Sequence, residues 1–227
     1  MVYESKNIRN VVLLGHPGSG KTTLAEDMLF EAKGISKRGR VEDGNTVSDY
    51  TSIEQTKGNS IFSTLMHAGW KDSKINIIDT PGYDDFIGEV LSSLKVADTA
   101  VMVLNAKSGV EVGTEIIWEY IEKFKTPAML VINQLDHEKA DYDNCVQQAI
   151  DRFGSHLLPV QYPLNQGTGF NSIVDALRMV MYVFPTGGGK PEKKPIPESE
   201  MPRALEMHNK LVEAAAENED GLMDKFF

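Results

Sequence analysis

The sequence predicts an α/β fold with a mainly parallel sheet and helices on both faces. Two observations indicate this class. Short apolar segments typical of buried strands alternate with amphipathic segments typical of helices. Residues 15–22 read G-H-P-G-S-G-K-T, which matches the phosphate-binding loop G-x-x-x-x-G-K-[ST] that joins a strand to a helix in such folds.

Each predicted element of the first two thirds follows from its apolar spacing. Strands are predicted over Asn10–Leu14, Ser60–Gly69, Lys74–Asp79, Thr99–Leu104 and Ala128–Asn133. Only Trp70 to Ser73 separate the second strand from the third, so this pair should form an antiparallel hairpin. Helices are predicted over Thr23–Lys33, Asp85–Val96, Val112–Phe124 and Asp141–Phe153.

The segment Gly34–Asn59 has no clear periodicity and is rich in Gly, Ser, Asp, Thr and Asn. Connections of this length without structure are uncommon in compact domains. We therefore expect the segment to be both functional and mobile.

The pattern changes from Leu157 onward. Strands are predicted over Leu157–Tyr162 and Met179–Phe184, with a short helical turn at Ser172–Leu177 between them. A connector rich in Gly, Pro and Lys follows at Gly187–Glu198, and then an amphipathic helix at Met201–Ala216. This part should form a small subdomain appended to the parallel-sheet domain.

Composition restricts the classes of partner. The chain has 227 residues, a net charge of −10 and a single cysteine, Cys145. No long Lys/Arg cluster is present, which argues against nonspecific binding to DNA, although a local RNA contact is compatible with the charge. One cysteine permits no internal disulfide, and neither a leader peptide nor an apolar run of about 18 residues is evident. A cytoplasmic protein that does not enter membranes is expected.

The phosphate-binding loop names a class of ligand. Its backbone N–H groups and the start of the following helix form a cradle for anions. Lys21 would reach the β- and γ-phosphates, and the Thr22 hydroxyl would bind Mg²⁺. The competing interpretation, a glycine-rich turn that binds nothing, is disfavoured by the strand before the loop and the helix after it. The predicted nucleotide contacts here are Gly15, His16, Pro17, Gly18, Ser19, Gly20, Lys21, Thr22 and Thr23.

A second motif, Asp79-Thr80-Pro81-Gly82, follows the apolar strand at residues 75–78. A carboxylate at a strand end can hold Mg²⁺, and a glycine lets the backbone come close enough to donate an N–H to a γ-phosphate. Asp79, Pro81 and Gly82 are therefore predicted nucleotide contacts, with Asp79 also at the metal.

The third motif, Asn133-Gln134-Leu135-Asp136, follows the strand that ends at residue 133. Asp136 could accept both the ring N–H and the exocyclic amine of guanine, which adenine cannot offer together. Asn133 would brace the base and the phosphate loop. The three motifs occur in order, each at the carboxyl end of a strand where open α/β sheets bind ligands. Together they predict a site for GTP or GDP with Mg²⁺.

The motifs and their flanks resemble translation elongation factor G, and more closely its elongation-factor-G-like branch. Arg38–Gly44 and Glu54–Gly58 resemble that family's first switch, and Asp79–Val90 its second. Leu211–Glu217 and Leu222–Phe227 resemble helices of the family's insert subdomain. The resemblance implies a P-loop NTPase of the G-domain type at residues 1–156 and part of an α+β insert at 157–227. The family's last sheet strand, its Ser-Ala guanine loop and its ribosome-contacting domains have no counterpart in this chain, which suggests a trimmed chain.

One departure from the family concerns catalysis. Active members have a histidine after D-T-P-G, whereas this chain has Tyr83, as the elongation-factor-G-like branch also does. A phenol is neutral at pH 7 and cannot supply the positive charge of an imidazolium. Tyr83 would either orient water through its hydroxyl or simply pack. The resemblance assigns catalytic positions to Lys21, Gly82 and Tyr83.

Three further departures concern binding. Gln134 replaces a lysine whose stem packs along the base and ribose, so nucleotide affinity should fall. The first switch ends in Asn59-Ser60 where the family has Ile-Thr; Ser60 keeps a hydroxyl for Mg²⁺, but the loop should order less well around GTP. Gly18 replaces an aspartate that is common in active elongation factors.

The sequence therefore predicts the GTP-binding domain of an elongation-factor-G-like translational GTPase, monomeric on its own and acting on the ribosome, with weak or slow hydrolysis. Two alternatives stay open: a ribosome-binding switch that does not hydrolyse GTP, and a relative that acts in ribosomal protection or peptide release. An ATPase or P-loop kinase is disfavoured by Asn133 and Asp136.

Overall fold

The computed structural model describes residues 3–186 and 188–217. The chain forms two compact units, Met1–Gln134 and Leu135–Phe227. The predicted boundary between a nucleotide-binding core (1–156) and an insert (157–227) is not tested by these compact units and stays a prediction. The resemblance noted for Leu222–Phe227 lies outside the described residues.

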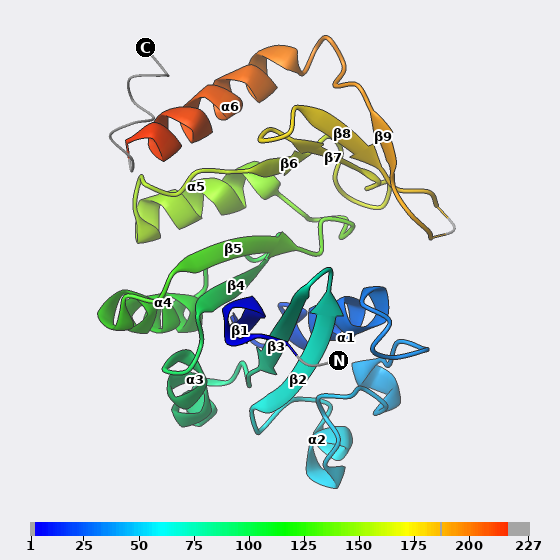
Figure 1. Cartoon of the computed structure of the whole chain (residues 1–227), viewed down its shortest axis with the longest axis vertical. Helices are drawn as coiled ribbons and strands as arrows, with labels where there is room; N and C mark the ends of the chain where they lie inside the picture. The colour runs from blue at the N-terminus through cyan, green and yellow to red at the C-terminus, as the bar shows by residue number, and fades with distance from the viewer. Residues whose placement is uncertain (1–2, 187, 218–227) are drawn as a thin grey trace. The chain divides into compact units, whose positions relative to one another are not determined.

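The first unit contains a five-stranded sheet in the order β2-β3-β1-β4-β5 (Figure 1). Its strands are β1 (Ile8–Leu14), β2 (Thr64–Trp70), β3 (Ser73–Asp79), β4 (Thr99–Asn105) and β5 (Ala128–Asn133). All pairs are parallel except β2 with β3, which is antiparallel. The predicted mainly parallel sheet and its one antiparallel hairpin are both confirmed.

Helices cover both faces of this sheet, with α1 on one side and α3 and α4 on the other (Figure 1). Their bounds are Lys21–Glu31 for α1, Ile87–Leu94 for α3 and Val112–Phe124 for α4. Short 3₁₀ helices, η1 (Ser5–Asn7) and η3 (Asp84–Phe86), precede β1 and α3. The parallel strands end at one edge, where the loops that follow β1, β3 and β5 hold the three motifs.

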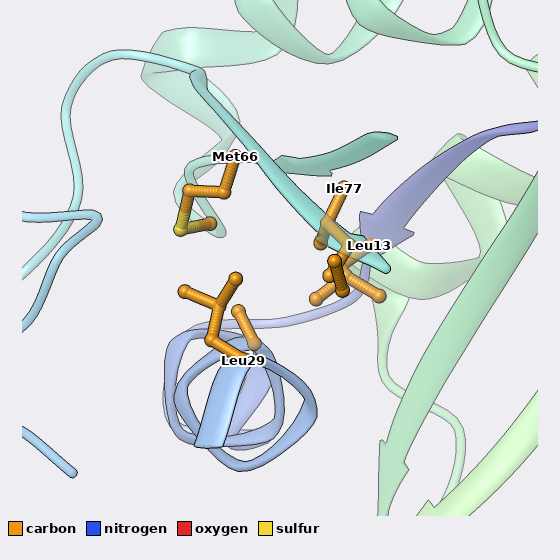
Figure 2. Close-up of a cluster of buried hydrophobic side chains, with 6 residues drawn as sticks. Leu13, Leu29, Met66 and Ile77 are labelled. Atoms are coloured by element: carbon orange, nitrogen blue, oxygen red, sulfur yellow. The ribbon is translucent and has the colours of Figure 1, made fainter. Parts of the chain in front are cut away.

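A cluster of buried apolar side chains packs α1 against the sheet. Leu29 of α1 faces Leu13, Met66 and Ile77 from β1, β2 and β3 (Figure 2), and each of the four is at most 6% exposed. Burying each such side chain stabilises the fold by about 1.5–3 kcal/mol. Because the phosphate loop joins β1 to α1, this packing also fixes the two ends of the loop.

The segment at 34–59 is more structured than predicted. It contains a 3₁₀ helix, η2 (Val41–Asp43), and a short α-helix, α2 (Ser52–Lys57). The side chain of Thr51 caps the N–H of Glu54, and the Glu54 carboxylate reaches back to Thr51. This capping box has a sequence signature, Thr-x-x-Glu, that periodicity alone does not reveal.

The second strand begins later than predicted, at Thr64 instead of Ser60. The N–H groups of Ile61 and Phe62 donate to the Glu54 carboxylate, and that of Ser63 donates to Glu89. Since carboxylates satisfy these backbone donors, residues 61–63 need no neighbouring strand.

The second unit combines helices with a four-stranded antiparallel sheet in the order β6-β7-β8-β9. Its strands are β6 (Gln161–Pro163), β7 (Ser172–Asp175), β8 (Val180–Val183) and β9 (Glu192–Lys194), and its helices are α5 (Tyr142–Phe153) and α6 (Met201–Ala216). Its α+β composition agrees with the prediction. No helix among residues 3–186 and 188–217 is long and apolar enough to cross a membrane.

Three predictions for the second unit are wrong in detail. Ser172–Leu177 is not a helical turn, because Ser172–Asp175 forms β7, a central strand paired on both sides. The strand predicted over Leu157–Tyr162 is limited to Gln161–Pro163. The connector at Gly187–Glu198 contains β9, whose three residues are all exposed, so no apolar pattern marks it. Short apolar runs do not distinguish strand from helix, and tertiary pairing decides.

Candidate functional site

The phosphate loop is held in shape by glycines that no other residue could replace without strain. Gly15, Gly18 and Gly20 have φ values of 136°, 77° and 92°. A Cβ on Gly15 would lie 2.3 Å from the carbonyl oxygen of Val103, and one on Gly20 would lie 2.3 Å from Asn133 Nδ2. The loop is therefore tightly surrounded by the ends of β4 and β5.

Lys21 is the buried cation of this loop and is only 6% exposed. Its Nζ donates to the carbonyl oxygens of Gly15 at 2.7 Å and His16 at 3.0 Å. Burial lowers its pKa to about 8, although the charges of Asp79 and Asp49 oppose that shift. A Cβ on Gly82 would lie 2.6 Å from Lys21 Nζ, so the second motif lies directly against this ammonium group.

Asp79, at the end of β3, is fully buried. Its Oδ2 accepts hydrogen bonds from the hydroxyls of Thr22 and Ser48, each at 2.7 Å. The Ser60 hydroxyl lies 3.3 Å from that of Thr22. The structure thus brings together the three predicted metal positions, Thr22, Ser60 and Asp79, and adds Ser48, which the sequence did not single out.

Asp49 is a second buried carboxylate beside this cluster and is 3% exposed. Among the described residues, neither of its oxygens has a hydrogen-bond partner of good geometry, and Oδ1 of Asp79 also lacks one. Burial raises the pKa of both carboxyls, although the nearby Ser60 hydroxyl opposes the rise at Asp49. Buried carboxylate oxygens without partners are costly unless a cation is bound. Carboxylate and hydroxyl oxygens are the ligands that Mg²⁺ prefers, so these residues fit that ion.

Asp49 went unnoticed in the sequence because it lies in a segment without periodicity. The only available signal is its place between Arg38–Gly44 and Glu54–Gly58, the two stretches that resemble a first switch. Its burial follows from tertiary packing, which a local pattern does not report.

Two further buried carboxylates hold the segment 34–63 in place. Glu26 of α1, 1% exposed, accepts from the N–H groups of Gly39 at 2.8 Å and Val47 at 2.5 Å. Glu54, also 1% exposed, accepts from Ile61 N at 3.0 Å and Phe62 N at 3.1 Å. Glu54 thereby fixes the backbone directly after Ser60.

The Glu54 carboxylate is stabilised in its charged form. Burial acts to raise its pKa, but the hydrogen bonds from Thr51, Ile61 and Phe62 outweigh burial, and the pKa is lowered. Thr51 supplies two of these bonds, from Oγ1 at 2.6 Å and from N at 3.3 Å. A single buried side chain therefore closes the loop from residue 51 to residue 62.

The third motif reaches the phosphate loop through two consecutive side chains. Asn133 Nδ2 donates to the carbonyl oxygen of Ser19 at 2.9 Å, and Gln134 Nε2 donates to that of Gly18 at 2.8 Å. The first contact lies on the phosphate loop that Asn133 is predicted to brace, and the role of Asn133 toward the base stays a prediction. Asp136 is exposed and belongs to the second unit, so its role toward guanine stays a prediction.

The remaining predicted positions differ in exposure. Tyr83 is 47% exposed at the start of η3, and Thr23 is exposed on the first turn of α1. Pro17 lies beside Gly82, and Pro81 is buried. His16 Nε2 contacts the carboxylate of Glu111, the residue before α4.

Comparisons with known proteins agree with the fold of the chain. A family model described as "Elongation factor Tu GTP binding domain" matches residues 6–222. Elongation factor G of Mycoplasma genitalium is 37% identical over 221 residues, which cover 96% of this chain and 32% of the relative. Elongation factor G of Mycoplasma pneumoniae is 37% identical over 220 residues, with the same coverage. The chain thus spans about a third of the length of these relatives.

Solved structures give the same result. The crystal structure of a Thermus thermophilus protein matches with a TM-score of 0.89 and 32% identity, covering 96% of this chain and 33% of that one. The fold assigned from sequence is therefore supported by similarity in three dimensions as well.

Replacing Asp49 with Asn should stabilise the protein when nucleotide and Mg²⁺ are absent. The substitution removes a buried charge that the nearby Ser60 hydroxyl does not fully compensate, and we expect the free energy of unfolding to rise by about 1 kcal/mol at pH 7. Because the folded pKa of Asp49 is raised above its unfolded value, the cost of its charge disappears as pH falls toward about 4. Urea unfolding of both proteins at the two pH values measures this.

The exposed Asp43→Asn, in the same segment, is the matched control and should change stability by less than about 0.5 kcal/mol. If Asp49→Asn destabilises the protein at pH 7, the Asp49 carboxylate makes net favourable contacts and the argument that it is a cation ligand is wrong.

Replacing Glu54 with Gln should release the backbone around Ser60. The amide keeps one acceptor oxygen, but its NH₂ group faces N–H or O–H groups that also donate. We expect the local free energy of unfolding around this site to fall by about 1–3 kcal/mol. Amide hydrogen exchange at Ile61 and Phe62 should accelerate by about tenfold or more. Glu54 has a lowered pKa, so its stabilisation is present above the unfolded pKa and is lost as pH falls through the folded value.

The exposed Glu42→Gln serves as the control for this change of charge. Unchanged exchange at residues 61 and 62 in Glu54→Gln would mean that something other than this carboxylate fixes the segment.

Proposed function

Because this chain belongs to the elongation factor Tu GTP-binding domain family, we propose that it binds GTP and GDP with Mg²⁺ and is the nucleotide switch of an elongation-factor-G-like translational GTPase. One observation supports this most directly. Buried oxygens of Asp49 and Asp79 lack partners among the described residues, and they lie in a cluster with the phosphate-loop residues Lys21 and Thr22.

The phosphate loop binds the nucleotide through Gly15–Thr23. Successive backbone N–H groups and the start of α1 contact the phosphates. Lys21, already surrounded by carbonyl oxygens, exchanges them for phosphate oxygens. The negative charge of a bound triphosphate returns its lowered pKa toward the normal range, so the ammonium form is favoured.

Asn133, Gln134 and Asp136 bind the guanine side. Asn133 and Gln134 hold the phosphate loop in register with the end of β5. Asp136 accepts from the ring N–H and exocyclic amine of guanine, which excludes adenine.

Thr22, Ser60 and Asp79 would hold Mg²⁺, together with Asp49. When bound, Mg²⁺ would neutralise the charge that develops on the phosphates. Ser60 reaches this cluster because Glu54 fixes the backbone that follows it. Release of Ser60 would remove one contact between the segment 34–63 and the phosphate loop, while the contacts of the segment with Glu26 and Asp79 remain.

Lys21, Gly82 and Tyr83 are the proposed catalytic positions. Lys21 and the Gly82 N–H stabilise charge on the γ-phosphate, and Tyr83 either orients the attacking water through its hydroxyl or packs beside the site. The products are GDP and phosphate. In the cell this chemistry would take place in the cytoplasm on the ribosome, during protein synthesis.

A second candidate is a switch that binds GTP on the ribosome without hydrolysing it. The observation in its favour is Tyr83, a half-exposed phenol that cannot supply the positive charge with which an imidazolium would stabilise the transition state. Ribosome binding with slow or absent hydrolysis would distinguish this candidate.

Replacing Asp136 with Asn should change base preference. The amide of Asn donates to the second carbonyl of xanthine but no longer accepts both guanine N–H groups. GDP affinity should fall about a hundredfold, and XDP should bind more tightly than GDP. Fluorescent-nucleotide titration with Mg²⁺, with ADP as competitor, measures this. Equal binding of GDP and ADP by the parent protein would overturn the guanine assignment.

Replacing Tyr83 with His should raise the single-turnover rate of GTP hydrolysis on ribosomes by about tenfold or more, because an imidazolium adds charge stabilisation. Tyr83→Phe distinguishes the two roles left open for Tyr83: a slower rate supports water orientation, and an unchanged rate supports packing. A parent protein as fast as Tyr83→His would contradict weakened chemistry. Nucleotide binding without hydrolysis in the parent would favour the second candidate.

A further inference from the structure

Three hydrogen bonds connect the end of β4 to the phosphate loop. The backbone N–H of Lys107 donates to Asn105 Oδ1 at 2.9 Å. Asn105 Nδ2 donates to Gln134 Oε1 at 2.8 Å. Gln134 Nε2 donates to the carbonyl oxygen of Gly18 at 2.8 Å. We call Asn105 and Gln134, with these contacts, the amide relay.

The direction of the amide relay is fixed at both ends. The Lys107 N–H can only donate, and the Gly18 carbonyl oxygen can only accept. The two side chains between them must each accept on one side and donate on the other, which a primary amide does. A carboxylate only accepts and an ammonium group only donates, so neither can replace one amide without opposing a like group.

The relay acts on carbonyl oxygens of the loop, whereas its N–H groups are the ones proposed to contact the phosphates. Gln134 and Asn133 hold two consecutive carbonyl oxygens, those of Gly18 and Ser19. In a trans peptide the C=O and the following N–H point in opposite directions. The N–H groups of Ser19 and Gly20 are therefore directed to the other side, and the Ser19 N–H indeed points across the loop to the His16 carbonyl oxygen.

The main chain at Gln134 supports the same role. Gln134 has a φ of 59°, a conformation that side chains other than glycine adopt at a cost of about 1 kcal/mol or more. The side chain that leaves this position makes one contact as donor and one as acceptor. These two contacts help to offset that cost.

We propose that Asn105 and Gln134 are a matched pair of positioning residues that sets the strength of nucleotide binding by fixing the phosphate loop. The inference deepens the proposed function and rests on it. The neutral Gln134 holds Gly18 without a positive charge, but only because Asn105 selects which end of its amide faces the loop. The lower affinity expected from the loss of a lysine is then confined to packing on the base and ribose.

If Asn105 and Gln134 act as a pair, two substitutions that are each harmful should compensate one another. In Asn105→Asp, a carboxylate faces Gln134 Oε1. In Gln134→Lys, an ammonium group faces Asn105 Nδ2. In the double variant the new ammonium group can donate to both the new carboxylate and the Gly18 carbonyl oxygen, so the relay is rebuilt with a different chemistry.

The test is GDP binding with Mg²⁺ by titration for the four proteins of this cycle. Each single variant should raise the Kd about five- to tenfold, the size of one disrupted hydrogen bond. The double variant should bind at least as tightly as the parent protein, because the relay is rebuilt and the lysine stem also packs on the base and ribose. Amide hydrogen exchange at Ser19 and Gly20, without nucleotide, should be faster in both single variants and normal in the double.

Asn76→Asp is the matched control. It breaks another amide–amide hydrogen bond, from Asn76 Nδ2 to Asn10 Oδ1 at 2.8 Å, near the other end of β1, and should leave the Kd unchanged. Additive effects of Asn105→Asp and Gln134→Lys would refute the pair, while nucleotide binding by the parent protein stands. If the parent protein binds no guanine nucleotide, the proposed function fails, and the exchange rates still decide whether the relay fixes the loop.

Discussion

The Asp79 carboxylate is fully buried at the end of β3, where water cannot solvate its charge. It is accommodated by hydroxyls from two other segments, Thr22 at the start of α1 and Ser48 in the long segment after it. One side chain thus joins the phosphate loop, the sheet and the first-switch segment. The arrangement of those three parts around the site follows from the need to satisfy this carboxylate.

The same burial leaves the site incompletely satisfied. Asp49 and Oδ1 of Asp79 have no hydrogen-bond partner among the described residues, and burial raises the pKa of both carboxyls. Lys21 is nearby, but its own pKa is lowered by the same loss of solvent. Without ligands, these buried charges lower the stability of the fold. Binding of a cation and an anion would compensate the charges, so ligand binding would stabilise the folded protein.

The buried glutamates Glu26 and Glu54 hold the backbone in place, whereas the buried aspartates Asp49 and Asp79 lie at the proposed metal site. Glu26 and Glu54 accept only from main-chain N–H groups or a hydroxyl, and their contacts close the segment 34–63 at several points. Main-chain contacts of this kind depend little on the identity of the residues they hold. Residues 59 and 60 can therefore differ from the Ile-Thr of the family, and the Ser60 hydroxyl still lies close to that of Thr22.

The sequence by itself determined the sheet, the bounds of α4, β5 and α6, and the loop at 15–22, because each depends on local periodicity or on glycines at fixed spacing. It also indicated that Asp79 and Asn133 lie near that loop, since parallel strands end at one edge. Only the tertiary structure decided that Asp49, Glu54 and Asn105 belong with them. These residues are brought in by burial and by hydrogen bonds between segments far apart in the chain, and no local pattern reports which main-chain donor a buried side chain will meet.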